Sequence, residues 1–332
     1  MPSKRHHYVS KFYLESFASS NSPKRGPLIY VYERGIEAPK WLPLPNAAVQ
    51  THYYSVDFGT GEKHDVFEKF LSVIEGNAAS VIREQIIAQD AELNDIDRQK
   101  LSLYIVMAML RVPKARDQMH RMVRDVWELI MKNTASTPGA LESLNEQLEA
   151  KTGKPFDVPA EQLREFLIGD RYKIVVDPVE SLKIIFGIAP SLMPMIHFMR
   201  WTVLQNDRPE PFLTSDNPVV YVDPTDPGGG YSAVGLANEG LELTFALSPT
   251  KCLLASHDPE FRNKIEGAPP EEARRLASTF KPKLRYAKAD SVTAREINRR
   301  IVHRATKYVF SSSDTPTLRR FISKHMPALA MA

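Results

Sequence analysis

The middle of the chain has the hydrophobic spacing of helices. Apolar side chains recur every three or four residues over residues 64–89, which predicts an amphipathic helix. Residues 95–133 predict a second, longer helix whose first half is apolar on all sides and should therefore be buried. Pro113 lies inside this segment, removes one backbone hydrogen bond and should kink or break the helix. Two further helices are expected, over residues 159–169 and 178–199.

Short β-rich segments dominate residues 200–256, where turns separate runs of β-branched and aromatic residues. A similar run, residues 28–34, lies near the N-terminus. Residues 291–312 and 315–325 are expected to close the chain as helices. Because helices precede strands without β–α–β alternation, we predict a helix-dominated α+β fold with a small, mainly antiparallel sheet in the C-terminal half.

The length of 332 residues fits one large domain or two intimate ones. We expect a single α+β domain over residues 1–332. Its parts would be an N-terminal motif with strands (1–60), a helical core (61–199), the sheet (200–256) and C-terminal helices (257–332). The net charge of +3 is too small to argue for nucleic-acid binding by itself.

The chain has one cysteine, Cys252, within an apolar strand. A single cysteine cannot form an internal disulfide and has no neighbour for a zinc site, so a reducing compartment is expected. The longest apolar runs, residues 101–110 and 184–199, are too short to span a bilayer. No uninterrupted apolar core of a signal peptide follows the basic N-terminus. We therefore predict a soluble, cytoplasmic protein that does not associate with membranes.

Several blocks along the chain match one family in order. They are "HHYVSKFYLESF" (6–17), "FEKFLSVIEGNAASVI" (67–82), "RVP" (111–113), "FLTSDNPV" (212–219), "LSP" (247–249) and "INRRIVHRATKYVFSS" (297–312). Together they resemble the bacterial domain-of-unknown-function family 4238, whose members typically open with HHY[VI]P-x-[FY]-x-L-x-x-F. Ser10 stands where that family usually has Pro, which bears on the rigidity of the entry turn. The resemblance implies a family and no activity, so function has to be argued from the site residues.

His6 and His7 open the first of these blocks. Neighbouring residues point to opposite faces on a strand and diverge by about 100° on a helix, so both rings rarely reach one metal ion. Either the two rings bond local backbone groups, or one of them faces a pocket as a metal ligand or general base.

His64 and Glu68 are four residues apart, a spacing that would let both ligate one metal ion on a helix. However, His64 lies where the predicted helix starts, where fraying spoils such geometry. No HExxH motif and no second histidine nearby supports a metal site.

Glu75 and Arg111 are predicted to form an ion pair. If residues 64–89 and 96–112 form an antiparallel helical hairpin, Glu75 lies within one turn of Arg111. Arg111 follows an apolar run, so its guanidinium needs a partner at low dielectric. The pair either fixes the register of the two helices, or presents Arg111 to an anionic ligand with Glu75 as its orienter or as an acid or base.

The turn "LTSDNPVV" contains Asp216 and Asn217 between two predicted strands. Such residues commonly bond backbone groups of their own turn. The alternative is that Asp216 projects from a strand end into a cleft, where it could ligate a divalent cation or act as a base.

Cationic residues line the predicted C-terminal helix. Arg295, Arg299 and His303 recur every four residues, with Arg300 and Arg304 beside them. This stripe could contact the phosphates of a nucleic acid, or it could be a solvated basic face that Glu296 interrupts.

The sequence has no GxSxG elbow, Walker loop or dinucleotide-binding glycine motif. The leading hypothesis is a nuclease-like hydrolase whose polar pocket contains His6 or His7, Glu75, Arg111, Asp216 and Asn217. The alternative is a non-catalytic module that binds nucleic acid, or a protein partner, through the basic C-terminal helix. A third interpretation is that these polar groups only specify the fold. No cofactor, metal ion or substrate is identified by the pattern.

Overall fold

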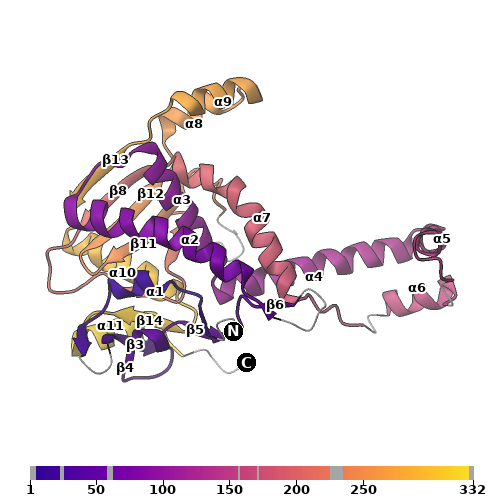
Figure 1. The fold of residues 1–332 in the computed structure, drawn as a ribbon, viewed down its shortest axis with the longest axis horizontal. Coiled ribbons are helices and arrows are strands. Elements are labelled where there is room, and N and C mark those ends of the chain that lie inside the picture. The colour runs from indigo at the N-terminus through magenta and orange to yellow at the C-terminus, as the bar shows by residue number, and fades with distance from the viewer. Residues whose placement is uncertain are drawn as a thin grey trace. The chain divides into compact units, whose positions relative to one another are not determined.

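The structure is a computed structural model that describes residues 5–22, 26–57, 63–155, 158–169, 172–224 and 235–328 (Figure 1). The chain divides into two compact units, each of which we describe by itself. Unit 1 comprises Met1–Lys114 and Leu182–Ala332, and unit 2 comprises Ala115–Ser181. The fold is α+β and helix-dominated, as predicted. The expectation of a single domain stays a prediction.

A helical hairpin forms the centre of unit 1. Helix α2 (Val66–Ser80) continues through a π-helical segment (Val81–Ile87) and packs against α3 (Asp95–Leu110). The Asn94 side chain caps α3 by accepting a hydrogen bond from the Asp97 backbone N–H at 2.8 Å. Nearly every apolar side chain of α3 is buried, which confirms the prediction from its apolar pattern. The hairpin covers one face of a β-sheet (Figure 1).

That sheet has the strand order β10–β11–β12–β8–β13. Its neighbouring strands are antiparallel except β13, which runs parallel to β8. The mainly antiparallel sheet was predicted for residues 200–256, but β13 falls in a part of the chain that was expected to be helical. The bounds are β8 Arg200–Gln205, β10 Val219–Val222, β11 Glu242–Ser248, β12 Lys251–Ser256 and β13 Leu284–Lys288.

A second sheet joins the two ends of the chain. It has the order β2–β3–β14–β9, and β4 pairs with β3. The helix predicted over residues 291–312 is wrong at its C-terminal end, because α10 ends at Arg304 and residues 308–311 form β14. The aromatic and β-branched run Tyr308–Phe310 pairs with β3 on one side and β9 on the other, and these long-range partners override the helical pattern. The bounds are β2 Ser20–Ser22, β3 Gly26–Glu33, β4 Lys40–Pro43, β9 Thr214–Ser215, α10 Ser291–Arg304 and β14 Tyr308–Ser311.

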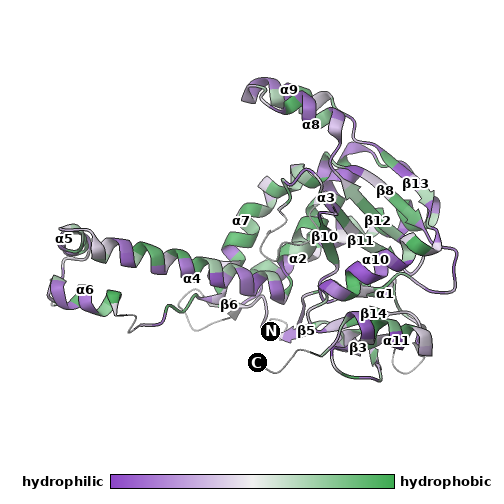
Figure 2. Ribbon diagram, turned by 180° about the vertical axis from the view of Figure 1, so that it is seen from behind, coloured by the Kyte–Doolittle hydropathy of each residue, from purple (hydrophilic) through white to green (hydrophobic). Residues whose placement is uncertain are grey.

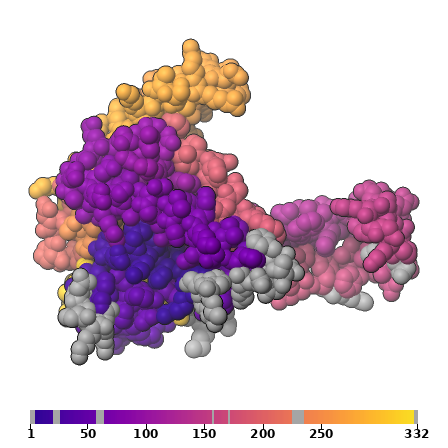
Figure 3. Space-filling view, viewed as in Figure 1, coloured from indigo at the N-terminus to yellow at the C-terminus, as the bar shows by residue number. Residues whose placement is uncertain are grey.

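The N-terminal motif contacts the helical hairpin and both sheets. Strand β1 (Arg5–His7) pairs with β5 (Val49–Thr51), and α1 (Lys11–Glu15) follows it. Tyr13 of α1 is buried and donates from its hydroxyl to the Ala246 carbonyl at 2.6 Å, while the same hydroxyl lies 2.7 Å from Thr214 Oγ1. In the space-filling view the surface of the hairpin borders that of the N-terminal segment (Figure 3).

Smaller elements complete unit 1. A two-stranded sheet pairs β6 with β7, and a 3-10 turn η1 follows β4. Helices α8 and α9 precede β13, and α11 follows β14. The bounds are η1 Leu44–Asn46, β6 Val56–Asp57, β7 Lys63–His64, α8 Pro259–Ile265, α9 Pro270–Thr279 and α11 Pro316–His325.

Unit 2 is built from helices. The break predicted at Pro113 is present, because α3 ends at Leu110 and α4 (Pro113–Ser136) starts at the proline itself. Helices α5 (Ala140–Thr152) and α6 (Ala160–Ile168) pack together on the C-terminal part of α4.

Helix α7 (Pro178–His197) begins in unit 2 and continues into unit 1. Among the described residues it is the one helix that is long and apolar enough to cross a membrane, and it is coloured mostly hydrophobic in Figure 2. One such helix is weak evidence, because a core helix of a soluble protein passes the same test.

Candidate functional site

The adjacent histidines lie on β1, where they occupy different environments. His6 is fully buried and its Nδ1 accepts a hydrogen bond from the Tyr54 backbone N–H at 2.8 Å. A neutral imidazole that accepts at Nδ1 carries its proton on Nε2, and this Nε2 lies 3.9 Å from Glu68 Oε2. The Tyr54 ring stacks on His6 with centroids 5.6 Å apart. His6 Nε2 therefore faces the Glu68 carboxyl group at a separation longer than a hydrogen bond.

His7 is half-buried and has separate contacts. Its Nε2 lies 3.5 Å from the Leu44 carbonyl oxygen, and its backbone carbonyl accepts from the Tyr54 hydroxyl at 3.3 Å. Burial lowers the pKa of His7, although the bond to Leu44 and the charge of Glu75 act in the opposite direction. The two rings have separate partners and are not placed to ligate one metal ion together, as expected for neighbours on a strand.

The predicted ion pair between Glu75 and Arg111 is confirmed. Arg111 Nη1 donates to Glu75 Oε1 at 2.5 Å, and Nη2 donates to the Ser10 hydroxyl oxygen. The arginine side chain is 2% exposed and that of Glu75 25%. Burial by itself would lower the pKa of Arg111, but the Glu75 carboxylate raises it above the usual range. Arg111 Nε is buried without a hydrogen-bond partner.

Glu68 lies near the Glu75–Arg111 pair, whose charges both act on its carboxyl group. It lies seven residues before Glu75 on α2, so the two carboxyl groups share one helix face two turns apart. Its side chain is 32% exposed. Burial and then the charge of Glu75 raise the pKa of Glu68. His64 lies on β7, before α2 begins, so the helical i, i+4 spacing that could have let His64 and Glu68 share a metal ion does not apply.

Aromatic side chains and Ser10 surround the two ion-pair partners. The Ser10 and Tyr104 hydroxyls are 2.8 Å apart, and the Tyr53 hydroxyl donates to the Arg111 carbonyl at 2.7 Å. Tyr54 and Tyr104 are buried, and burial raises the pKa of both phenols. Ser10 is the N-cap residue of α1, but its side chain makes no capping hydrogen bond. The hydroxyl contacts Arg111 and Tyr104 instead. We call the group of His6, Glu68, Glu75 and Arg111 the carboxylate cluster.

Asp216 and Asn217 occupy a different place. Asp216 is buried and accepts three backbone N–H bonds, from Thr306 at 2.8 Å, Lys307 at 2.7 Å and Tyr308 at 3.0 Å. Burial raises the pKa of Asp216, and these three bonds counter that effect. Asn217 Nδ2 donates to the Arg304 carbonyl at 3.3 Å.

Both residues thus hold the turn between α10 and β14 against β9. Among the described residues, no hydrogen bond or ion pair joins Asp216 or Asn217 to the carboxylate cluster. The carboxylate of Asp216 therefore bonds backbone groups, but these lie about 90 positions away in the chain and not, as the simpler interpretation expects, in its own turn.

The basic stripe of α10 is partly neutralised. Arg299 donates to Glu296 at 2.7 Å, and Arg300 pairs with Glu242 at 2.7 Å and Glu296 at 3.2 Å. Arg295 lies over the Phe321 ring at 6.0 Å. Towards the C-terminal end of α10, burial and the charge of Arg304 lower the pKa of both His303 and Lys114. Lys114, His303 and Arg304 therefore lie close together at that end of the helix.

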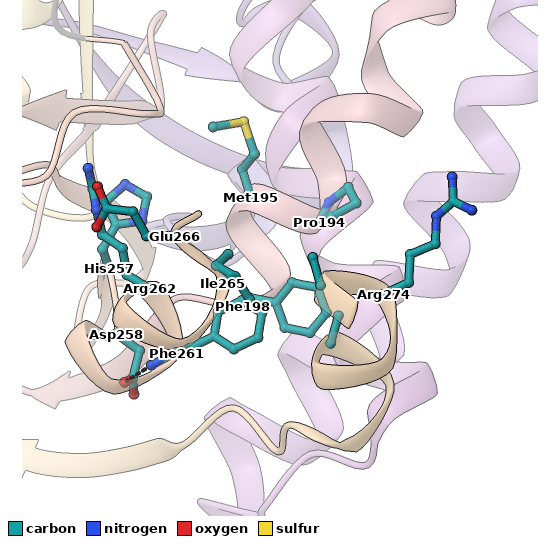
Figure 4. A pocket seen from close by; sticks show the side chains of 12 residues that line it. Pro194, Met195, Phe198, His257, Asp258, Phe261, Arg262, Ile265, Glu266 and Arg274 are labelled. Atoms are coloured by element: carbon teal, nitrogen blue, oxygen red, sulfur yellow. Dashed lines mark hydrogen bonds between the residues drawn. The ribbon is translucent and has the colours of Figure 1, made fainter. Parts of the chain in front are cut away.

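A pocket of about 550 Å³ lies elsewhere in unit 1, between the end of α7, α8 and α9 (Figure 4). Its centre is formed by the stacked rings of Phe198 and Phe261, whose centroids are 4.7 Å apart. None of the predicted site residues lines it. His257 Nε2 bonds the Leu236 carbonyl at 2.8 Å and Asp258 caps α8, so these two polar groups have structural partners. Arg262, Glu266 and Arg274 also line the pocket, whose other walls are mainly apolar.

Within the part of the chain that the structure describes, no group of three or more histidine, cysteine or acidic side chains could hold a metal ion. Cys252 is buried in β12, and burial raises the pKa of its thiol. The sequence contains one signal that places Glu68 on the same helix face as Glu75. Both Glu68 and Glu75 border the buried residues Leu71, Ile74 and Ala78 of α2.

No curated protein and no solved structure matches the chain. One family model does match, described as "Protein of unknown function (DUF4238)", and the match covers residues 5–315. These residues are nearly the whole chain and include the N-terminal histidines, the hairpin and β14. The resemblance inferred from the sequence blocks is thus confirmed, and the protein belongs to the DUF4238 family of proteins of unknown function.

Proposed function

We propose that the protein is a nuclease-like hydrolase in which Glu68 and Glu75 act as an acid–base pair. One observation carries this proposal. Glu68 has a raised pKa, lies 3.9 Å from His6 Nε2 and shares a helix face with Glu75, which pairs with the buried Arg111. A carboxyl group with a raised pKa near a second carboxyl group is typical of hydrolytic acid–base sites.

The chemistry follows from these surroundings. Glu68 keeps its proton to higher pH than an ordinary glutamate, so it can give that proton to a leaving oxygen. Glu75 uses Oε1 for Arg111, which leaves Oε2 to take a proton from an attacking water. For a phosphodiester, water oxygen would bond to phosphorus while the bond from phosphorus to the leaving oxygen breaks.

The other polar residues have supporting roles. Arg111 is too buried to reach a substrate directly, so we assign it as a positioning residue for Glu75. Its positive charge in a low-dielectric site also favours negative charge that develops nearby in the transition state. His6 faces Glu68 at 3.9 Å, a longer contact, and we assign it as a positioning residue for that carboxyl group. Asp216 and Asn217 are left out of the proposed pair, because both oxygens of Asp216 are occupied by backbone N–H groups.

Hydrolysis of bis(p-nitrophenyl) phosphate and of a labelled single-stranded oligonucleotide tests the proposal. We expect Glu68→Gln and Glu75→Gln each to lower kcat by about 100-fold or more, the usual contribution of general acid–base catalysis. The matched control is Glu84→Gln, which changes an exposed glutamate on the helical continuation of α2. Absence of hydrolysis by the unaltered protein, or equal rates for Glu68→Gln and Glu84→Gln, would contradict it.

The second candidate is a module that binds nucleic acid without chemistry. It is favoured by the accumulation of Lys114, His303 and Arg304 at the end of α10, where the nearby acid Asp216 is already bonded to backbone. Filter binding at increasing salt should then give a steep slope for the unaltered protein, and Arg304→Ala should reduce that slope by about one. Arg275→Ala, on the exposed side of α9, is the control. No binding at low salt would reject this candidate.

A cytoplasmic location also belongs to the proposal. It is supported by the single buried Cys252, since a protein of a reducing compartment has no need of disulfides.

A further inference from the structure

Among its described residues, unit 2 has a small core for its size. Its buried apolar cluster consists of Ala135, Leu141 and Leu167, with a few partly buried neighbours such as Met131. Helix α4 at the same time exposes large hydrophobic side chains along its length (Met122, Val126, Trp127, Leu129 and Ile130), and Leu129 is 60% exposed. Hydrophobic and hydrophilic residues alternate along this helix in Figure 2. A helical unit with so small a core is marginal unless another surface covers it.

The apolar residues of α4 fall on two different faces. Met131 and Ala135 contact the cluster formed with α5 and α6. Met119, Met122, Val126, Leu129 and Asn133 follow each other at intervals of three and four residues, which places them on one stripe of the helix. Val126 and Met131 are about 140° apart around the helix axis. The stripe from Met119 to Asn133 is therefore not the face that α5 and α6 cover, and we call it the open face.

We propose that the open face of α4 binds the open face of a second copy of this chain, with the two helices antiparallel. In heptad terms Met119, Val126 and Asn133 are a positions, and Met122 and Leu129 are d positions. Antiparallel pairing places each Val126 beside Leu129 of the second copy, so that the two layers at the centre are apolar. Asn133 falls beside Met122 of the second copy.

The charges beside the open face are self-complementary in this arrangement. Asp125 and Lys132 occupy the g positions, and antiparallel pairing brings Asp125 of each copy next to Lys132 of the other. The same arrangement brings the e-position residues Val123 and Ile130 together. A parallel pair would instead place Asp125 beside Ile130. Two-fold symmetry requires one surface to complement itself, and this surface does so in both charge and apolar pattern.

The pattern also favours a second copy over other occupants. Asp125 pairs with the neighbouring Arg124 at 3.2 Å and is 63% exposed. A lipid surface would contact the apolar stripe but would bring this acidic side chain to its edge. A different protein would need a matching stripe of its own, whereas a second copy supplies one with the correct charges.

Sedimentation equilibrium of the full chain tests the proposal. We expect a mass of twice 37.5 kDa for the unaltered protein. Asp125→Lys places two lysines together at each contact, and Lys132→Asp places two aspartates together, so each variant should dimerise at least about tenfold more weakly. A mixture of the two variants restores opposite charges at both contacts and should recover the dimer.

The control is Asp117→Lys, which makes the same charge change on the far side of α4 and should leave the dimer unaffected. Val126→Glu should give a monomer, with circular dichroism to check that α4 still folds. A monomeric unaltered protein, or a dimer that tolerates both single charge changes, would overturn the proposal. Recovery in the mixture is a result that misfolding of either variant could not produce.

Discussion

The guanidinium of Arg111 donates to the hydroxyl oxygen of Ser10, 101 positions earlier in the chain. This bond ties the first helix of the chain to the end of α3, and the same serine oxygen lies 2.8 Å from the Tyr104 hydroxyl. Arg111 therefore shares its buried charge between the Glu75 carboxylate and a neutral oxygen. A proline at position 10 would have no side-chain oxygen to offer.

Ser10→Ala should lower the free energy of unfolding by about 1–3 kcal/mol, because it leaves a buried N–H of Arg111 and the Tyr104 hydroxyl without this partner. Urea denaturation measures the change. Ser72→Ala is the matched control, since that serine is exposed on α2 and bonds only the Glu68 carbonyl. Equal stability of the two variants would show that the Ser10 hydroxyl does not stabilise the fold.

A double-mutant cycle on Glu75 and Arg111 should reveal strong coupling. Glu75→Gln leaves a buried arginine without its counter-charge and should cost about 3 kcal/mol of unfolding free energy. Arg111→Met combined with Glu75→Gln removes both charges, and should be more stable than the sum of the two single changes predicts. Additive losses would mean that the two side chains act independently of each other.

The Glu75–Arg111 pair and the location of Asp216 differ in how far the sequence could predict them. The pair follows from the length of two helical patterns and the short break between them, which fix the register of a hairpin. The partners of Asp216 are backbone groups of Thr306, Lys307 and Tyr308, and no local pattern identifies them. The approach of Glu68 to His6 likewise depends on the pairing of β1 with β5, a contact between short strands that carry little propensity of their own.

Glu68 should make the stability of the protein depend on pH. Its pKa is raised in the folded state, mainly by burial, so the folded protein binds this proton more tightly than the unfolded chain does. Stability from this group is thus present below the unfolded pKa and is lost as pH rises through the folded pKa. Glu68→Gln removes the titration and should gain stability relative to the unaltered protein as pH rises.

Unfolding in urea at several values between pH 4 and pH 8 measures this difference, with Glu84→Gln as the exposed comparison. A stability difference between Glu68→Gln and the unaltered protein that stays constant over the range would contradict the raised pKa. Since the side chain is 32% exposed, solvent screens part of the effect.

Asp216→Asn should destabilise the protein without affecting hydrolysis per folded molecule. The substitution keeps the size of the side chain but replaces one acceptor oxygen with an N–H donor, which then faces backbone N–H groups of residues 306–308. Loss of charge-assisted bonds of this kind costs about 1.5–3 kcal/mol of unfolding free energy. Thermal unfolding measures that loss, and kcat for bis(p-nitrophenyl) phosphate, scaled to the folded fraction, separates it from chemistry. A fall in kcat with unchanged stability would return Asp216 to the catalytic set and contradict its assignment as an anchor of the turn between α10 and β14.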